Sequence, residues 1–265
     1  MAPITTTQLP SSFSDEPVLL SCIEERVATL ILNQPGQYNV LSEALLSALQ
    51  ESLDEIADNR NIRVVVIAGA GRAFCAGHDL KEMRANPNRE YYEDLFERCG
   101  RVMMRIAQVP QPVIARVHGV ATAAGCQLVA ACDLAVASDN ARFAVSGINL
   151  GLFCSAPAVA LTRNISRKRA FEMLVTGNFV DAGTAMELGL INHVAPVESL
   201  DSIIDDLVKN ILAKSAIAVE MGKRMFYEQY KYDVEAAYEY AAHIMAANMM
   251  SDDAMKGIDG FLGRR

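Results

Sequence analysis

The sequence predicts an α/β protein in which helices and strands stack in layers around a buried interior. Two patterns along the chain predict this class. Up to Ala156, short apolar runs typical of buried strands alternate with segments of helical periodicity, and beyond Ala156 helical patterns dominate. The chain has 265 residues, of which 51% are hydrophobic, so it can bury a large core in one domain or two.

The predicted elements follow one another in a regular order. Residues 17–24 and 26–33 are β-prone runs that predict a hairpin-like start. Residues 41–56 carry apolar side chains at helical spacing, with Ser42 as the expected N-cap. A strand at 64–68 and a helix at 91–109 are separated by a polar surface loop around Pro87. Strands at 113–117 and 134–137 enclose a helix of small residues at 122–131, and later helices are predicted at 167–176, 181–188, 200–212, 216–230 and 234–250.

The last two predicted helices carry many methionine and tyrosine side chains, among them Met221, Met245 and Tyr238. One interpretation is a helical core that packs on its own domain. The other is a subunit interface, because methionine and aromatic residues are enriched in such surfaces. We expect a flexible tail at residues 1–16, a core at 17–200 and a helical oligomerisation region at 201–265.

Charge and cysteine content exclude several classes of protein. The formal net charge of −8 argues against general nucleic-acid binding, which needs a basic surface. No apolar run approaches the ~20 residues of a membrane-spanning helix, and the first basic residue, Arg26, comes too late for a signal or transit peptide. The six cysteines include no C-x-x-C pair, which favours reduced thiols. We therefore expect a soluble, cytoplasmic protein without nucleic-acid or membrane partners.

Two turns of small residues are predicted to carry the chemistry. Residues 74–80 (Phe-Cys-Ala-Gly-His-Asp-Leu) follow one apolar run, and residues 119–127 (Gly-Val-Ala-Thr-Ala-Ala-Gly-Cys-Gln) follow another. Each pattern predicts a buried strand that enters a tight turn and then a helix. The first N–H groups of a helix lack intrahelical acceptors, and the helix N-terminus carries partial positive charge. Two such turns facing each other would form an oxyanion hole from main chain alone.

Other motifs give weaker indications. Gly69 and Gly71 follow a strand as in a dinucleotide-binding fingerprint, but the third glycine is missing. The four histidines lack metal-ligand spacing, so no metal site is predicted. The side chain of His78 has either a functional role or none beyond the turn. Cys75 or Cys154 could act as a nucleophile, although buried cysteines mostly behave as small hydrophobic residues.

Several segments resemble the crotonase (enoyl-CoA hydratase/isomerase) superfamily over nearly the whole chain, from residue 17 to 265. The segments that carry the resemblance are 33–35, 39–41, 74–80, 112–115, 119–133, 141–143, 149–151, 176–177 and 185–190. The resemblance implies a spiral of ββα units with a helical C-terminal region that trimerises, often as a dimer of trimers. It also implies a lyase or isomerase of fatty-acid metabolism that binds acyl-CoA, with coenzyme A as part of the substrate and no separate cofactor.

The resemblance also implies roles for individual residues. The thioester carbonyl oxygen would lie between the backbone N–H groups of His78 and Ala124, which would stabilise an enolate. Phe261 and Arg264 would reach the nucleotide of a neighbouring subunit. Contacts to adenine and pantetheine would come from Ala73, Ala76, Asp79 and Leu80, and Gly147 would also lie against the substrate.

The sequence departs from the family at two positions. Hydratases of the family carry glutamates where this chain has Gln127 and Gly147. Hydration needs one group that takes a proton from water and another that gives one. An amide does neither at neutral pH, and glycine has no side chain. We therefore expect hydration of crotonyl-CoA to be weak or absent.

Three functions stay open at this point. The first is a thioester enzyme that uses the oxyanion hole together with Gln127, Ser146 or Cys154. In one variant, a malonyl-type thioester loses carbon dioxide, which creates the enolate without a strong base. The second is a pseudoenzyme that binds acyl-CoA without turnover. The third, a scaffold or oligomerisation role alone, is disfavoured because both turns are intact.

Overall fold

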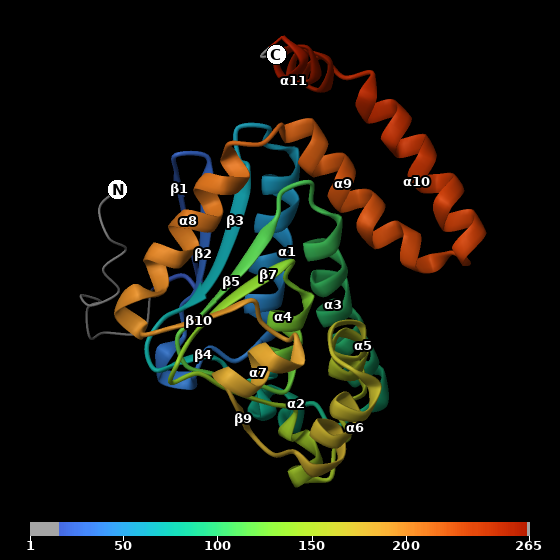
Figure 1. Ribbon diagram of the computed structural model, residues 1–265. Helices are drawn as coiled ribbons and strands as arrows, with labels where there is room; N and C mark the ends of the chain where they lie inside the picture. Colours follow the sequence, from blue (N-terminus) through green and yellow to red (C-terminus); the bar gives the residue numbers. More distant parts are fainter. Residues whose placement is uncertain (1–15, 264–265) are drawn as a thin grey trace.

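Two β-sheets organise the fold, and the computed structural model describes them within residues 16–263 (Figure 1). Most of the predicted N-terminal tail, together with Arg264, lies outside these residues. The larger sheet has six strands in the order β1-β2-β3-β5-β7-β10. These strands are β1 (Leu19–Glu24), β2 (Val27–Leu32), β3 (Val64–Gly69), β5 (Val113–Val117), β7 (Leu134–Ser138) and β10 (His193–Ala195). The predicted hairpin start is confirmed, because β1 and β2 pair antiparallel, and the remaining pairs are parallel.

The smaller sheet has four strands in the order β4-β6-β8-β9. They are β4 (Ala73–Cys75), β6 (Val120–Thr122), β8 (Arg142–Ala144) and β9 (Val180–Asp181). In three successive steps, β3–β4, β5–β6 and β7–β8, the chain adds one strand to the large sheet and the next strand to the small one. Helices follow these steps, so the predicted spiral of ββα units is confirmed.

Helices cover both faces of the large sheet because successive side chains of its strands point to opposite faces. Val65 and Ile67 of β3 belong to the main core, which also contains the apolar faces of α1 (Glu43–Asp58) and α3 (Arg89–Gln108). Val64 and Val66 pack on the other face in a second cluster with α8 (Leu200–Leu212). The predicted boundary at 201 assigns α8 to the C-terminal region, although α8 packs directly on the sheet (Figure 1).

The remaining helices surround the small sheet or follow the core. Near the small sheet lie α2 (Leu80–Ala85), α4 (Ala124–Ala131), α5 (Ser155–Asn164), α6 (Arg167–Thr176) and α7 (Ala182–Leu188), with short 3₁₀ turns at Pro35–Gln37, Ser146–Leu150 and Val197–Ser199. After α8 come α9 (Ala216–Glu228), the turn Gln229–Lys231, α10 (Val234–Met249) and α11 (Asp252–Leu262). Figure 1 shows α10 and α11 extending away from the sheets. Among the helices of the described residues, none is both long and apolar enough to cross a membrane.

Most predicted elements are confirmed within two or three residues, and Ser42 caps α1 by accepting a hydrogen bond from the Leu45 N–H. The helix predicted to begin at 122 is wrong at its start. Thr122 belongs to β6 and pairs with Ala144, so α4 begins at Ala124. The small-sheet strands, β10, α5 and α11 were not predicted.

Candidate active site

Strand pairing brings the two predicted turns together. Strands β4 and β6 are parallel neighbours, so both end at the same edge of the small sheet, where the chain turns toward α2 and α4. The contact between the turns is close. A Cβ atom on Gly77, which has φ +93°, would lie 2.9 Å from the Ala123 Cβ and 3.2 Å from the Ala124 nitrogen. The two turns therefore face each other, which is the condition for the oxyanion hole predicted from the sequence.

Each turn leaves one backbone N–H group available. The His78 and Ala124 N–H groups have no hydrogen-bond acceptor within residues 16–263. Ala124 is the first residue of α4, where a helix lacks an internal acceptor. The preceding residue, Ala123, has φ +51° and contributes no side-chain cap. By contrast, Asp79 caps α2, because its Oδ1 accepts hydrogen bonds from the first N–H groups of that helix.

Both residues line a cavity of about 720 Å³. That volume falls within the usual range for a small-molecule site. Eight of the residues predicted from the sequence line it: Ala76, His78, Asp79, Leu80, Ala124, Ser146, Gly147 and Cys154.

Of the other four predicted residues, the structure places three outside the cavity wall. Ala73 is buried in β4 and is not part of the cavity wall. Gln127 is only 4% exposed on α4 and also lies outside the wall, with its Oε1 buried and unpartnered in the described structure. Phe261 is exposed on α11. Arg264 is outside the described residues.

Position 147 has no room for a side chain. A Cβ atom on Gly147 would lie 2.6 Å from the Leu152 carbonyl oxygen and 2.8 Å from the Cys154 Sγ. The turn is closed by a 3.0 Å hydrogen bond from the Leu152 N–H to the Gly147 carbonyl. The space that a glutamate side chain would enter is therefore filled by the chain itself.

The polar groups of the cavity differ in their protonation. The Ser146 and Thr122 hydroxyl oxygens are hydrogen-bonded at 2.7 Å. Burial raises the pKa of the Cys154 thiol above its usual value, although the nearby Gly147 N–H partly opposes this, so the thiol is protonated. Burial lowers the pKa of His78, and the neighbouring Leu41 carbonyl opposes the change in part. The imidazole is therefore neutral at pH 7.

Sequence reasoning missed much of the apolar wall of this cavity. Phe96 of α3 lines it and meets the His78 ring edge-on, with ring centroids 5.4 Å apart. Helical spacing to Tyr92 was the one available signal for Phe96. Other unpredicted wall residues include Tyr38, Val40, Met83, Leu150, Leu152, Phe153 and Pro157.

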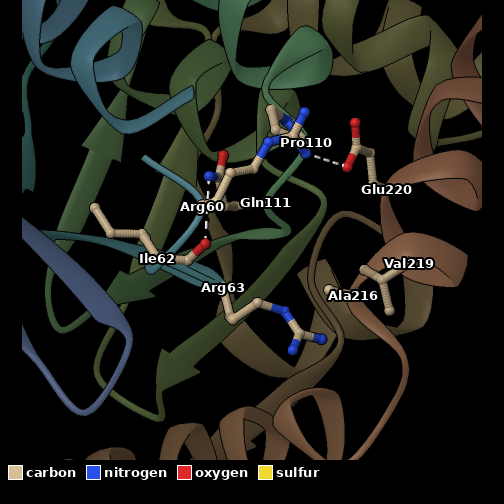
Figure 2. A pocket seen from close by; sticks show the side chains of 8 residues that line it. All are labelled: Arg60, Ile62, Arg63, Pro110, Gln111, Ala216, Val219 and Glu220. Atoms are coloured by element: carbon tan, nitrogen blue, oxygen red, sulfur yellow. Dashed lines mark hydrogen bonds and ion pairs between the residues drawn. The ribbon is translucent and has the colours of Figure 1, made fainter. Parts of the chain in front are cut away.

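A second cavity lies between α9 and the start of β5, and it is too small for an acyl group. Its volume is about 40 Å³, enough for a single water molecule. Figure 2 shows the Arg60–Glu220 ion pair at its edge and Gln111, which donates to the Ile62 carbonyl. The Gln111 Oε1 is buried without a partner in the described chain, which fits a bound water molecule rather than a substrate.

Comparison with known proteins defines the class of this one. A family model described as enoyl-CoA hydratase/isomerase matches residues 22–265, so the chain belongs to that family. The predicted resemblance to the crotonase superfamily is thereby confirmed.

Among the similar proteins are several named enoyl-CoA hydratase domain-containing protein 3. Residues 151–155 (Gly-Leu-Phe-Cys-Ser) lead us to expect similarity to the same branch of the family. The mitochondrial protein of that name from Rattus norvegicus is 41% identical over 257 residues, which are 97% of this chain and 86% of the relative. The crystal structure of the human protein has a TM-score of 0.90 at 41% identity, covering 94% of this chain and 98% of that one. An enoyl-CoA hydratase structure from Mycobacterium smegmatis has a TM-score of 0.93 at 58% identity, with the same coverage of 94% and 98%.

Proposed function

We propose that this protein binds acyl-CoA thioesters and stabilises an enolate through the His78 and Ala124 amides. The observation that supports the proposal is that His78 and Ala124, whose backbone N–H groups have no acceptor in the described chain, line the same cavity. Fixed donors of this kind bind the developing negative charge without reorganising. Removal of one such donor costs about 10²–10³ in rate in other enzymes.

A matched pair of ligands tests the proposed carbonyl contact. Butyryl-CoA carries the thioester oxygen, whereas S-butyl-CoA has the same chain and no carbonyl group. Two neutral hydrogen bonds contribute about 1–3 kcal/mol together, so the thioether is expected to bind about 5- to 150-fold more weakly. Isothermal titration calorimetry measures both affinities. Equal affinities would contradict the role of the two amides.

We further propose that the family's two-glutamate hydration is weak or absent in this protein. Gln127 lies outside the cavity wall, and position 147 has neither a side chain nor room for one. The assay follows loss of the enoyl thioester's ultraviolet absorbance with crotonyl-CoA, alongside a family hydratase that has both glutamates. Turnover comparable to that enzyme would contradict the proposal.

A second candidate function is decarboxylation of a malonyl-type thioester. It is favoured because Asp79 is the only carboxylate of the cavity wall within residues 16–263, and it caps α2. Carbon dioxide loss would supply the enolate without a carboxylate base. Malonyl-CoA and methylmalonyl-CoA, with released carbon dioxide as the readout, test this candidate. Tight binding without release or hydration would instead favour a non-catalytic acyl-CoA-binding protein.

We also propose that α10 and α11 form a subunit interface, in a homotrimer or a dimer of trimers. Neither helix buries a residue within the chain, and both expose large apolar side chains. This favours the interface interpretation over a self-contained helical core. Light scattering after size exclusion distinguishes monomer, trimer and hexamer. The exposed apolar side chains include Val234, Tyr238, Met245, Met249, Met250, Met255 and Phe261.

The cellular location stays a prediction. The rat relative is called mitochondrial in its name, which differs from the cytoplasmic location expected from the sequence. Imaging of the tagged full chain in its source cells decides between the two.

A further inference from the structure

We propose that the side chain of His78 is the acid–base group of this site and moves a proton at the carbon next to the thioester carbonyl. The inference rests on the proposed function, because it needs a thioester held by the two amides. It assigns two tasks to one residue. The backbone N–H of His78 binds the carbonyl oxygen, and its imidazole exchanges a proton with the α-carbon.

The first support is the position of the ring. His78 lines the cavity, and its ring packs edge-on against Phe96, which lines the same cavity. Because amide and imidazole belong to one residue, a carbonyl oxygen on the amide brings the α-carbon into the same part of the cavity. The ring also has unused hydrogen-bonding capacity. Nδ1 is enclosed and has no partner at hydrogen-bond geometry in the described chain, although the Leu41 carbonyl lies close enough to act on the ring, and Nε2 is left as the nitrogen that a ligand can reach.

The second support is the state of the other titratable side chains of the wall. The Asp79 carboxylate caps α2. The Tyr38 hydroxyl accepts a 2.9 Å hydrogen bond from Arg72. Lys81 is exposed on α2, and burial keeps the Cys154 thiol protonated. His78 is the remaining candidate base.

The proposed step balances as a simple proton transfer. The Nε2 lone pair forms an N–H bond as the Cα–H bond breaks. The released electron pair becomes the carbon–carbon double bond of the enolate, and the carbonyl π pair moves to the oxygen between the two amides. The resulting imidazolium returns the proton to the α-carbon. Both events leave the thioester intact, and no oxidant or second reactant is required.

Deuterium exchange tests the step directly. Butyryl-CoA is incubated with the full-length protein in D₂O, and α-deuterium incorporation is followed by mass spectrometry. General acid–base catalysis contributes typically 10²–10⁴-fold, so His78→Ala and His78→Gln are expected to lower the exchange rate by at least about 100-fold. Both variants keep the backbone N–H, so butyryl-CoA affinity should stay within about threefold. His193→Gln is the matched control, because His193 is exposed on β10 outside the cavity.

Added imidazole gives a second readout that a purely structural role would not produce. It should restore exchange in His78→Ala in proportion to its concentration, and it should leave His78→Gln unchanged. Unchanged exchange in both variants, with affinity retained, would overturn the inference. So would a wild-type protein that binds butyryl-CoA but exchanges no α-proton, and in that case thioester binding would stand. A wild-type protein that binds no thioester would overturn the proposed function itself.

Discussion

Substitution of Gly147 by alanine tests how tightly the 146–154 turn is packed. The added Cβ would lie 2.6 Å from the Leu152 carbonyl oxygen and 2.8 Å from the Cys154 Sγ. The carbonyl contact is with backbone, and the turn is closed by the Leu152 N–H hydrogen bond to Gly147. The Leu152 carbonyl therefore cannot move away without shifting the turn, whereas the Cys154 side chain can only relieve its own contact by rotating. Such overpacking costs about 1–3 kcal/mol.

Thermal unfolding measures the expected loss of stability. For a chain of this size, 1 kcal/mol corresponds to about 2–4 °C, so Gly147→Ala should lower the Tm by about 2–12 °C. The protein has no tryptophan, so far-UV circular dichroism is the suitable probe. Gly100→Ala is the matched control, because Gly100 lies in α3 with no heavy atom within 4 Å of an added Cβ. Alanine there should stabilise the helix by about 0.5–1 kcal/mol.

A double variant separates the two contacts. Cys154→Ala removes the sulfur contact but not the Leu152 carbonyl, so Gly147→Ala/Cys154→Ala should recover only part of the lost Tm. The same packing predicts that Gln127→Glu/Gly147→Glu gains no efficient hydration, because a glutamate at 147 must first displace the turn. A Tm for Gly147→Ala within 1 °C of wild type would refute this reasoning.

Three further predictions concern the buried Lys223–Asp133 ion pair, the buried thiols and two buried histidines. Lys223 donates to Asp133 and to two carbonyls, so Lys223→Met should cost about 3–5 kcal/mol in urea unfolding, and adding Asp133→Asn should recover part of it. Iodoacetamide at pH 8 should label Cys22 in the native protein, whereas the buried thiols of Cys75, Cys99, Cys126 and Cys132 should react only after unfolding; mass spectrometry identifies the labelled sites. Burial raises the pKa of three of them to about 12: Cys75, Cys99 and Cys126. Burial lowers the pKa of His78 and His118 in the folded state below the ordinary histidine pKa of about 6.5. As the pH falls through 6.5, the unfolded state therefore binds more protons than the folded state, and stability decreases. The urea midpoint should fall from pH 7.5 to pH 5.5, and less so in His118→Gln.

Elements with long local patterns were predictable from the sequence. The amphipathic spacing behind Ser42 defines α1, and the apolar run at 64–68 defines β3, because each pattern extends over enough residues to be read locally. Strands β4 and β6 have three residues each, and their stability comes from pairing with each other across more than forty residues of chain. That pairing also explains why Thr122 extends a strand instead of starting the predicted helix.

The candidate site was also predictable only as far as local sequence patterns reach. The small-residue turns at His78 and Ala124 were recognisable from local chemistry, but the register of β4 against β6 decides that they face each other. Helix α4 is buried on nearly all sides, so no periodicity indicates that Gln127 lies outside the cavity wall. The sequence places Gly147 in the site, yet only the fold reveals that Cys154 fills the space beside it.

The use of main chain would explain how the proposed thioester site works without a glutamate at position 127 or 147. The His78 and Ala124 amides are positioned by strand register, by the contact of Gly77 with the second turn and by the start of α4. None of these features depends on the side chain at 127 or 147. The proposed carbonyl site should therefore be sensitive to small-residue substitutions such as Gly77→Val and tolerant of Gln127→Ala. The reverse order of sensitivity would mean that Gln127, despite its burial, holds the ligand.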